Sequence, residues 1–142
     1  MSKDFHLLQY YCQLIKENFL YFKELTNYMV ADSFFARSEV VETITALGMH
    51  FISRLRDDAA LQYLNRQPKT GKRGRSKLYA GKVIISQPEM SYFKLIFHSK
   101  EMKIFNAIVY YQAFKRKINL SIVVFYDKKA VCCWMQQFVL KT

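Results

Sequence analysis

The stretch Tyr28-Met29-Val30-Ala31-Asp32 decides how the first half of the chain folds, because a short apolar run there ends directly on a carboxylate. The turn-forming Asn27 precedes the run and favours a break in regular structure before it. These residues predict a buried strand with Asp32 at its C-terminal end.

The sequence on both sides of this strand predicts helices. Residues 4–25 carry apolar side chains at steps of three and four, which is typical of an amphipathic helix. After the strand, Ser38 fits the N-cap of a helix through Leu47, and Gly48 is placed to close it. Residues 49–56 then alternate as a second strand, with Met49, Phe51, Ile52 and Leu55 set against His50, Ser53, Arg54 and Arg56. Helix, strand, helix and strand in this order predict a layered α/β unit, in which ligands gather at the C-terminal ends of strands.

The second half of the chain has a different character. Residues 66–82 contain seven Lys and Arg, no Asp or Glu, one Pro and three Gly, and they predict a flexible basic loop. Residues 83–86, 92–98, 103–114, 118–126 and 131–140 are rich in Val, Ile, Phe and Tyr and predict strands of an antiparallel sheet. A tight turn is expected at residues 127–129. The fold class is therefore α/β to α+β, with one region over residues 1–58 and a second, β-rich region over residues 59–142.

Charge is the first indication of function. The chain has a formal net charge of +11, and residues 1–65 carry −2 whereas residues 66–142 carry +13. Such an excess of cations attracts polyanions, so a nucleic acid is the expected partner. The residues expected to contact phosphates are Lys69, Lys72, Arg73, Arg75 and Lys77 in the loop, and Lys115, Arg116 and Lys117 between two predicted strands. The alternative is that the loop is solvated and only aids solubility.

Asp32 has two interpretations. A carboxylate at the end of an apolar strand is a common way to present a metal ligand at the rim of a sheet. The alternative is an Asp whose side-chain oxygens cap the turn into the next helix.

Other features of the sequence exclude several classes. The chain has no apolar run of the roughly 18 residues that a membrane-spanning helix needs, and no signal peptide pattern, so we expect a cytoplasmic protein without a membrane partner. Its three cysteines lack the spacing of zinc sites.

Residues 28–64, followed by residues 68–83 and 113–129, resemble bacterial insertion-sequence transposases of the DDE type. The most specific segments are VADSFFA at residues 30–36, HFISRLRDDAAL at residues 50–61, and KTGKRGRSK at residues 69–77 with the following Tyr79. The resemblance covers nearly the whole chain. It implies a partial RNase-H-like core over residues 1–58, followed by a basic β-rich insertion.

The resemblance also implies a chemistry. In this family three carboxylates hold two divalent metals, usually Mg²⁺, for DNA cleavage and strand transfer. DNA is thus the partner that the resemblance implies, and a homodimer is one possible assembly of the full-length protein. Asp32 matches the second catalytic aspartate and is the expected catalytic and metal-binding residue. The first aspartate would end an earlier strand, and the final glutamate would follow the basic sheet on a later helix. We therefore expect an internal fragment of a transposase that is inactive alone. The alternative is a non-catalytic, basic α+β protein that binds nucleic acid.

Overall fold

The computed structural model describes residues 3–69, 71, 73–126 and 131–137. The chain forms two compact units, which are residues 1–56 with 134–142, and residues 57–133. The sequence suggested a division after residue 58. In the structure the boundary between the units follows Arg56. Residues 134–137 of the last described strand, β8 (Val131–Gln137), also belong to the first unit. The molecule is a mixed α/β protein, as predicted.

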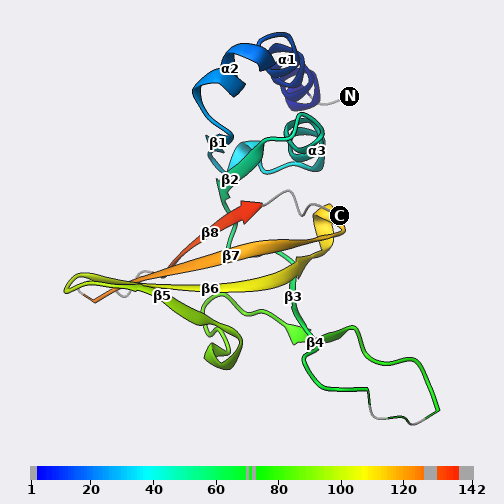
Figure 1. The fold of residues 1–142 in the computed structure, drawn as a ribbon, viewed down its shortest axis with the longest axis vertical. Helices are drawn as coiled ribbons and strands as arrows, with labels where there is room; N and C mark the ends of the chain where they lie inside the picture. Colours follow the sequence, from blue (N-terminus) through cyan, green and yellow to red (C-terminus); the bar gives the residue numbers. More distant parts are fainter. Residues whose placement is uncertain (1–2, 70, 72, 127–130, 138–142) are drawn as a thin grey trace. The chain divides into compact units, whose positions relative to one another are not determined.

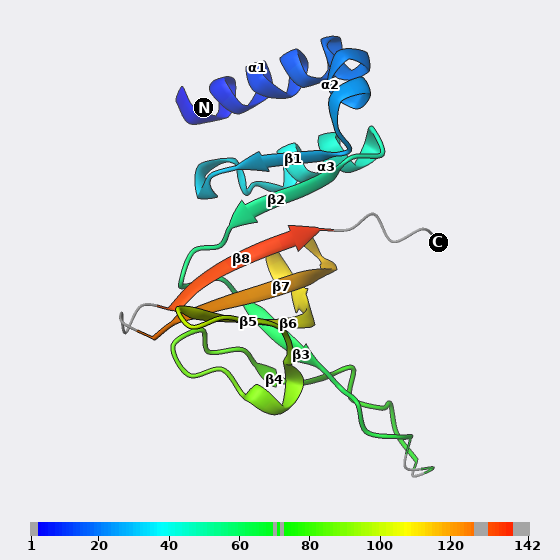
Figure 2. The ribbon, with the colours of Figure 1, turned by 60° about the vertical axis from the view of Figure 1, so that its left-hand side comes forward.

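The first unit contains a β-α-β motif. Helices α1 (Lys3–Glu17) and α2 (Phe19–Leu25) precede β1 (Tyr28–Ala31), which is followed by α3 (Ser38–Ala46) and β2 (His50–Arg54). Strands β1 and β2 are parallel, and Ala31 lies opposite Ser53 (Figure 2). Residues 134–137 pair with β2 in the antiparallel direction. The predicted strand before Asp32, the helix that begins at Ser38 and the strand that follows it are confirmed. The prediction that the first strand is buried is wrong, because Tyr28 and Val30 of β1 are exposed. Ser38 is also the first residue of the helix and not its N-cap, which is Arg37.

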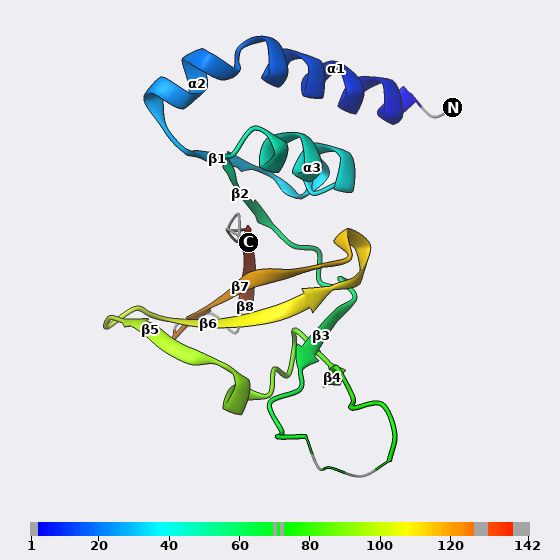
Figure 3. The same cartoon turned by 45° about the vertical axis from the view of Figure 1, so that its right-hand side comes forward.

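Helix α3 forms the core of the first unit. Its apolar side chains Val40, Val41 and Ile44 are buried, and the helix contacts α1 on one side and β2 on the other (Figure 3). Gly48 ends the helix as predicted. With φ +72° it adopts the left-handed conformation, so that Met49 N–H donates to the Ile44 carbonyl and Gly48 N–H to the Thr45 carbonyl.

Two details of the first unit differ from the prediction. The expected single helix over residues 4–25 is interrupted at Asn18, whose side-chain amide donates to the Leu14 carbonyl and competes with the helical ladder. Ser53 was expected on the polar side of its strand, but it is fully buried on the same side as Phe51. Its hydroxyl donates to the Asp32 carbonyl at 2.9 Å, which satisfies the buried oxygen.

The second unit is an antiparallel sheet (Figure 1). Its strands are β3 (Leu61–Leu64), β4 (Tyr79–Lys82), β5 (Lys94–His98), β6 (Met102–Tyr111) and β7 (Arg116–Phe125). Their order is β7-β6-β3-β4, and β5 pairs with β6 beside β3. Every pairing among these strands is antiparallel, which confirms the predicted arrangement.

The register gives this sheet two distinct faces. On one face Ala107 lies opposite Leu120 and Val109 opposite Ile118, and all four side chains are buried. The other face, which we call the outer face, carries Ile108, Tyr110, Lys117 and Asn119. The alternation of strand residues therefore separates an apolar core from a polar surface.

The predicted strands of the second unit need several corrections. Strand β3 was not predicted. The expected strand at residues 83–86 is irregular backbone, and β4 lies just before it at Tyr79–Lys82. Val83 and Ile85 are buried all the same, so the apolar signal there marks core side chains rather than a strand. The turn expected at residues 127–129 lies outside the described residues.

Candidate functional site

Asp32 directly follows β1 and caps the next turn. Its Oδ1 accepts a hydrogen bond from Phe34 N–H at 2.9 Å, at the start of a short 3-10 helix over Ser33–Phe35. Its side chain is exposed, and its backbone carbonyl accepts the Ser53 hydroxyl. The residue thus performs the capping role, and it does so at the C-terminal end of a strand in a parallel pair.

The described residues do not complete a metal site around Asp32. Within this part of the chain, no group of three or more His, Cys, Asp or Glu side chains could hold a metal ion. Two divalent cations at about 4 Å need several carboxylates, so Asp32 and its described neighbours do not fit them.

The sheet of the first unit is open beside Asp32. Among the described strands β1 pairs only with β2, which leaves its other edge without a partner. The side chain of Val30 is 66% exposed, and Tyr28 on the same face is 46% exposed. The unpaired backbone groups along this edge are able to pair with a further strand.

The basic loop of the second unit is closed at its base by Asn65. The Asn65 amide donates to the Lys77 carbonyl at 2.7 Å, and its backbone N–H donates to the Leu78 carbonyl at 3.0 Å. Its side-chain oxygen accepts from Gln67 N–H, so one side chain secures both ends of the loop.

The bases of this loop have different roles. Arg66 is exposed but engaged within the protein, because its guanidinium donates to the carbonyls of Ser91 and Tyr92 and lies 5.0 Å from the centre of the Tyr92 ring. The other described bases of the loop are exposed, and their side chains have no partner in the described parts of the chain; they are Lys69, Arg73, Arg75 and Lys77. Lys72 lies outside the described residues. The exposed bases are thus available to an external anion.

The three bases at the start of β7, Lys115, Arg116 and Lys117, have different surroundings. Lys115 has the left-handed φ of 49° in the turn before β7. Arg116 is half-buried, and its Nε donates to the Phe114 carbonyl at 3.4 Å. Lys117 points to the outer face, because it lies opposite Tyr110. The structure therefore does not bring all three cations to one surface.

A base that sequence reasoning did not single out shares the outer face with Lys117. Tyr110 pairs with Lys117 on one side and with Gln62 on the other, and Gln62 pairs with Lys82. Directly opposed residues in antiparallel strands share a face, so Lys117, Tyr110, Gln62 and Lys82 form one row across four strands. We call it the cross-strand row. The strand register reveals it, whereas the sequence places Lys82 only at the end of a basic run.

Comparison of the chain with protein-family models, curated proteins and solved structures finds no match. None of the described helices is both long and apolar enough to cross a lipid bilayer.

Proposed function

We propose that this chain is the central part of a DDE-type transposase that acts on DNA in the bacterial cytoplasm, and that it is inactive alone. In this proposal the first unit is part of an RNase-H-like core, and the second unit is an insertion that contacts DNA through its exposed bases. The proposal starts from the sequence resemblance around Asp32, and three features of the structure support it.

The first supporting feature carries the proposal. Asp32 ends an edge strand of a parallel β-α-β motif, where carboxylates of α/β enzymes meet their ligands. The backbone groups along the free edge of β1 could pair with another strand. A carboxylate at the end of that strand would lie beside Asp32, as the proposed chemistry requires.

The second supporting feature is the distribution of charge. Residues 57–133 carry fifteen Lys and Arg against five Asp and Glu, so the second unit has a charge of +10. The first unit has seven bases against six acids, or +1. A unit with this excess binds the sugar-phosphate backbone in preference to neutral or cationic partners.

The third supporting feature is that three cationic side chains of the loop have no partner among the described residues. Lys69, Arg73 and Arg75 are exposed on the loop and have no partner among the described residues. Such side chains can neutralise phosphates without first breaking an internal ion pair.

The proposed metal chemistry needs more than the described residues provide. Asp32 is one carboxylate, and its Oδ1 already accepts Phe34 N–H. The Mg²⁺ ions that the resemblance implies would need further carboxylates from segments on either side of this chain. We therefore assign no chemical step to the described residues alone.

A second candidate function is a non-catalytic protein that binds nucleic acid. It is favoured by the capping role of Asp32, which explains this residue without any metal. Both candidates share the DNA-binding second unit, and they differ only in whether Asp32 takes part in catalysis.

A plasmid-nicking assay separates the two candidates. The purified chain should not cleave DNA with Mg²⁺ or Mn²⁺. When it is expressed together with the coding segments that flank it in its genome, the longer protein should nick plasmid DNA with Mg²⁺. Substitution of Asp32→Asn in that protein should lower the rate of plasmid nicking by about 100-fold or more, because a carboxylate ligand of the metals is lost. Each tenfold loss of rate corresponds to about 1.36 kcal/mol of lost transition-state stabilisation.

The control is Asp57→Asn, which removes an exposed carboxylate of the other unit and should leave nicking unchanged. Cleavage by the chain alone that is lost in Asp32→Ala would contradict the expected inactivity. The non-catalytic function would be favoured if the flanking segments encode neither a strand that ends in Asp nor a helix with Glu. It would also be favoured if nicking survives Asp32→Asn.

A further inference from the structure

A pocket of about 500 Å³ lies along β3 and β4 at the base of the basic loop. It is lined by Gln62, Asn65, Gln67, Lys77, Tyr79, Ala80, Gly81, Lys82 and Tyr92. Two of these residues are bases, three carry side-chain amides, and none is an acid. The pocket therefore offers hydrogen-bond donors and positive charge without a carboxylate to oppose them.

A β-bulge builds the wall of this pocket. Gln62 lies opposite Lys82 and Leu64 opposite Tyr79, with a register shift between Tyr63 and Leu64. Gly81 lies opposite Tyr63 directly beside the bulge, with φ +156°, a conformation that side-chain-bearing residues rarely adopt. Because opposed residues share a face, Gln62 and Lys82 project side by side.

The loop adds the second cation. Asn65 holds the Lys77 carbonyl at 2.7 Å, so the backbone of Lys77 is fixed at the rim of the pocket. The side chains of Lys77 and Lys82 are exposed, and within the described residues neither has an ion-pair partner. The side-chain amides of Gln62 and Gln67 likewise have no hydrogen-bond partner among the described residues.

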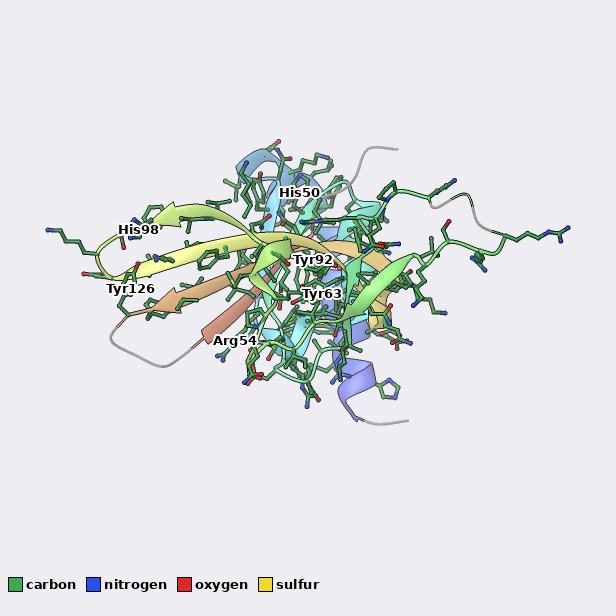
Figure 4. All side chains as sticks on the ribbon, turned by 90° about the horizontal axis from the view of Figure 1, so that it is seen from below. His50, Arg54, Tyr63, Tyr92, His98 and Tyr126 are labelled. Carbon is green, nitrogen blue, oxygen red and sulfur yellow. The ribbon has the colours of Figure 1, made fainter. Side chains whose placement is uncertain are left out.

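The aromatic rings of the pocket do not offer a platform for a nucleobase. The ring of Tyr92 stacks on Tyr63, with 4.3 Å between the ring centres, and the guanidinium of Arg66 lies over the Tyr92 ring. Tyr63 and Tyr92 are labelled near one another in Figure 4. The rings of Tyr79 and Tyr110 are 4.8 Å apart. Base stacking requires an open aromatic face, so these tyrosines are not assigned a base-stacking role.

The hydroxyl of Tyr79 is engaged within the sheet. Burial, followed by the charge of Tyr110 and a side-chain hydrogen bond with Tyr110, raises the pKa of Tyr79 above its ordinary value of 10.0. The groups left to an anion are the ammonium groups of the lysines and the amide N–H groups of the glutamines, which together match an oxyanion with several acceptor oxygens.

We propose that this pocket binds one phosphate group of a nucleic-acid backbone, with Lys77 and Lys82 as its cations and Gln62 as a neutral donor. This inference rests on the proposed DNA binding and specifies where one phosphate is held. Lys117, at the other end of the cross-strand row, is three strand spacings from Lys82, or about 14 Å at roughly 4.8 Å per spacing. It would contact a different phosphate of the same nucleic acid.

The test is fluorescence anisotropy with a labelled DNA duplex over a range of salt concentrations. Each lost phosphate contact flattens the slope of log K against log salt by about 0.9. The variant Lys77→Gln combined with Lys82→Gln, which removes both cations of the one phosphate, should flatten the slope by this amount, and Lys82→Gln alone should flatten it by less. Across a fourfold rise in salt, the affinity of the wild type should therefore fall about 3.5-fold more than the affinity of the double variant.

Lys16→Gln is the matched control, because Lys16 is an exposed lysine of α1 in the first unit. A second measurement identifies the anion by titrating inorganic phosphate into ¹⁵N-labelled protein. The side-chain amide of Gln62 and the backbone amide of Gly81 should shift, and the double Gln variant should abolish both shifts. DNA should compete with inorganic phosphate for these shifts.

Equal salt slopes for Lys82→Gln and Lys16→Gln would overturn the phosphate pocket, while DNA binding by the loop could still be demonstrated. If the wild type fails to bind DNA, the proposed function is wrong, and the phosphate titration then decides the pocket separately. Shifts at Gln62 in that case would support a site for free phosphate and overturn the nucleic-acid assignment. No shifts would overturn the site altogether.

Discussion

Asp32 is held through two different atoms. Its Oδ1 accepts Phe34 N–H and its backbone carbonyl accepts the Ser53 hydroxyl, each at 2.9 Å. The position of Asp32 at the end of a strand was predictable from YMVAD, because an apolar run followed by a carboxylate is a local pattern. Its chemistry was not predictable, since capping and metal binding use the same carboxylate oxygens.

Ser53 shows why an isolated polar residue can mislead. Its polar character suggested that Ser53 belongs with Arg54 and Arg56, but strict strand alternation places it on the face of Phe51, and its side chain is fully buried. Its hydrogen-bond partner is a backbone carbonyl 21 residues earlier in the chain. Periodicity contains no information about such a partner, so only the folded structure reveals it.

Tyr63 gives a pH-dependent prediction. Its hydroxyl accepts Glu89 N–H at 2.8 Å, and burial is the main cause that raises its pKa above 10.0. The folded state therefore keeps the phenol proton at a pH where the unfolded chain loses it. This contribution to stability is complete below about pH 10 and declines as the pH rises through the folded-state pKa.

Urea unfolding of the wild type and Tyr63→Phe should measure this effect. At neutral pH the variant should be less stable by about 1–3 kcal/mol, since Glu89 N–H loses its partner. Above pH 10 the difference should shrink, because only the wild type has this ionisable group. Tyr126→Phe, which alters an exposed tyrosine, is the control. A difference that stays constant or grows with pH would contradict the assignment.

At the scale of elements, local signals explain which parts of the fold were predictable. The strand β1, the helix α3 and its end at Gly48 were expected because an apolar run, an amphipathic repeat and a glycine stop lie next to one another. Strands β3 and β4 have four residues each and are joined across a bulge. Their pairing depends on the closure of the basic loop by Asn65, which no local period encodes.

The two basic segments of the second unit can be distinguished by substitution. The triple variant Lys69→Gln, Arg73→Gln and Arg75→Gln should flatten the salt slope of DNA binding by up to about 2.7, which is about 0.9 for each of three contacts. Its effect should be the same for every duplex sequence, because these bases are expected to meet phosphates. The stability of the variant should change by less than about 0.5 kcal/mol, since the residues are exposed.

The comparison variant is Lys115→Gln with Lys117→Gln, on the hairpin between β6 and β7. A smaller change is expected there, because of the two only Lys117 lies in the cross-strand row. An unchanged slope in the loop variant, together with a large loss in the hairpin variant, would assign DNA binding to the hairpin instead.

At the scale of the whole molecule, charge and chemistry are divided between two units. The candidate catalytic residue lies in a unit of charge +1, and the exposed cations lie in a unit of charge +10. The charge difference was evident from the sequence, because it needs only a count. The sequence did not show which cations share the outer face in the cross-strand row, because this depends on how β3, β4, β6 and β7 are aligned.

Binding of the DNA backbone by the basic unit is tested by measuring equilibrium affinity for duplex DNA over a range of salt concentrations. The purified chain should bind unrelated duplexes with equal affinity, and log K should fall linearly and steeply with log salt. A strong preference for one sequence that survives at high salt, or an absence of binding at low salt, would contradict this mode of binding.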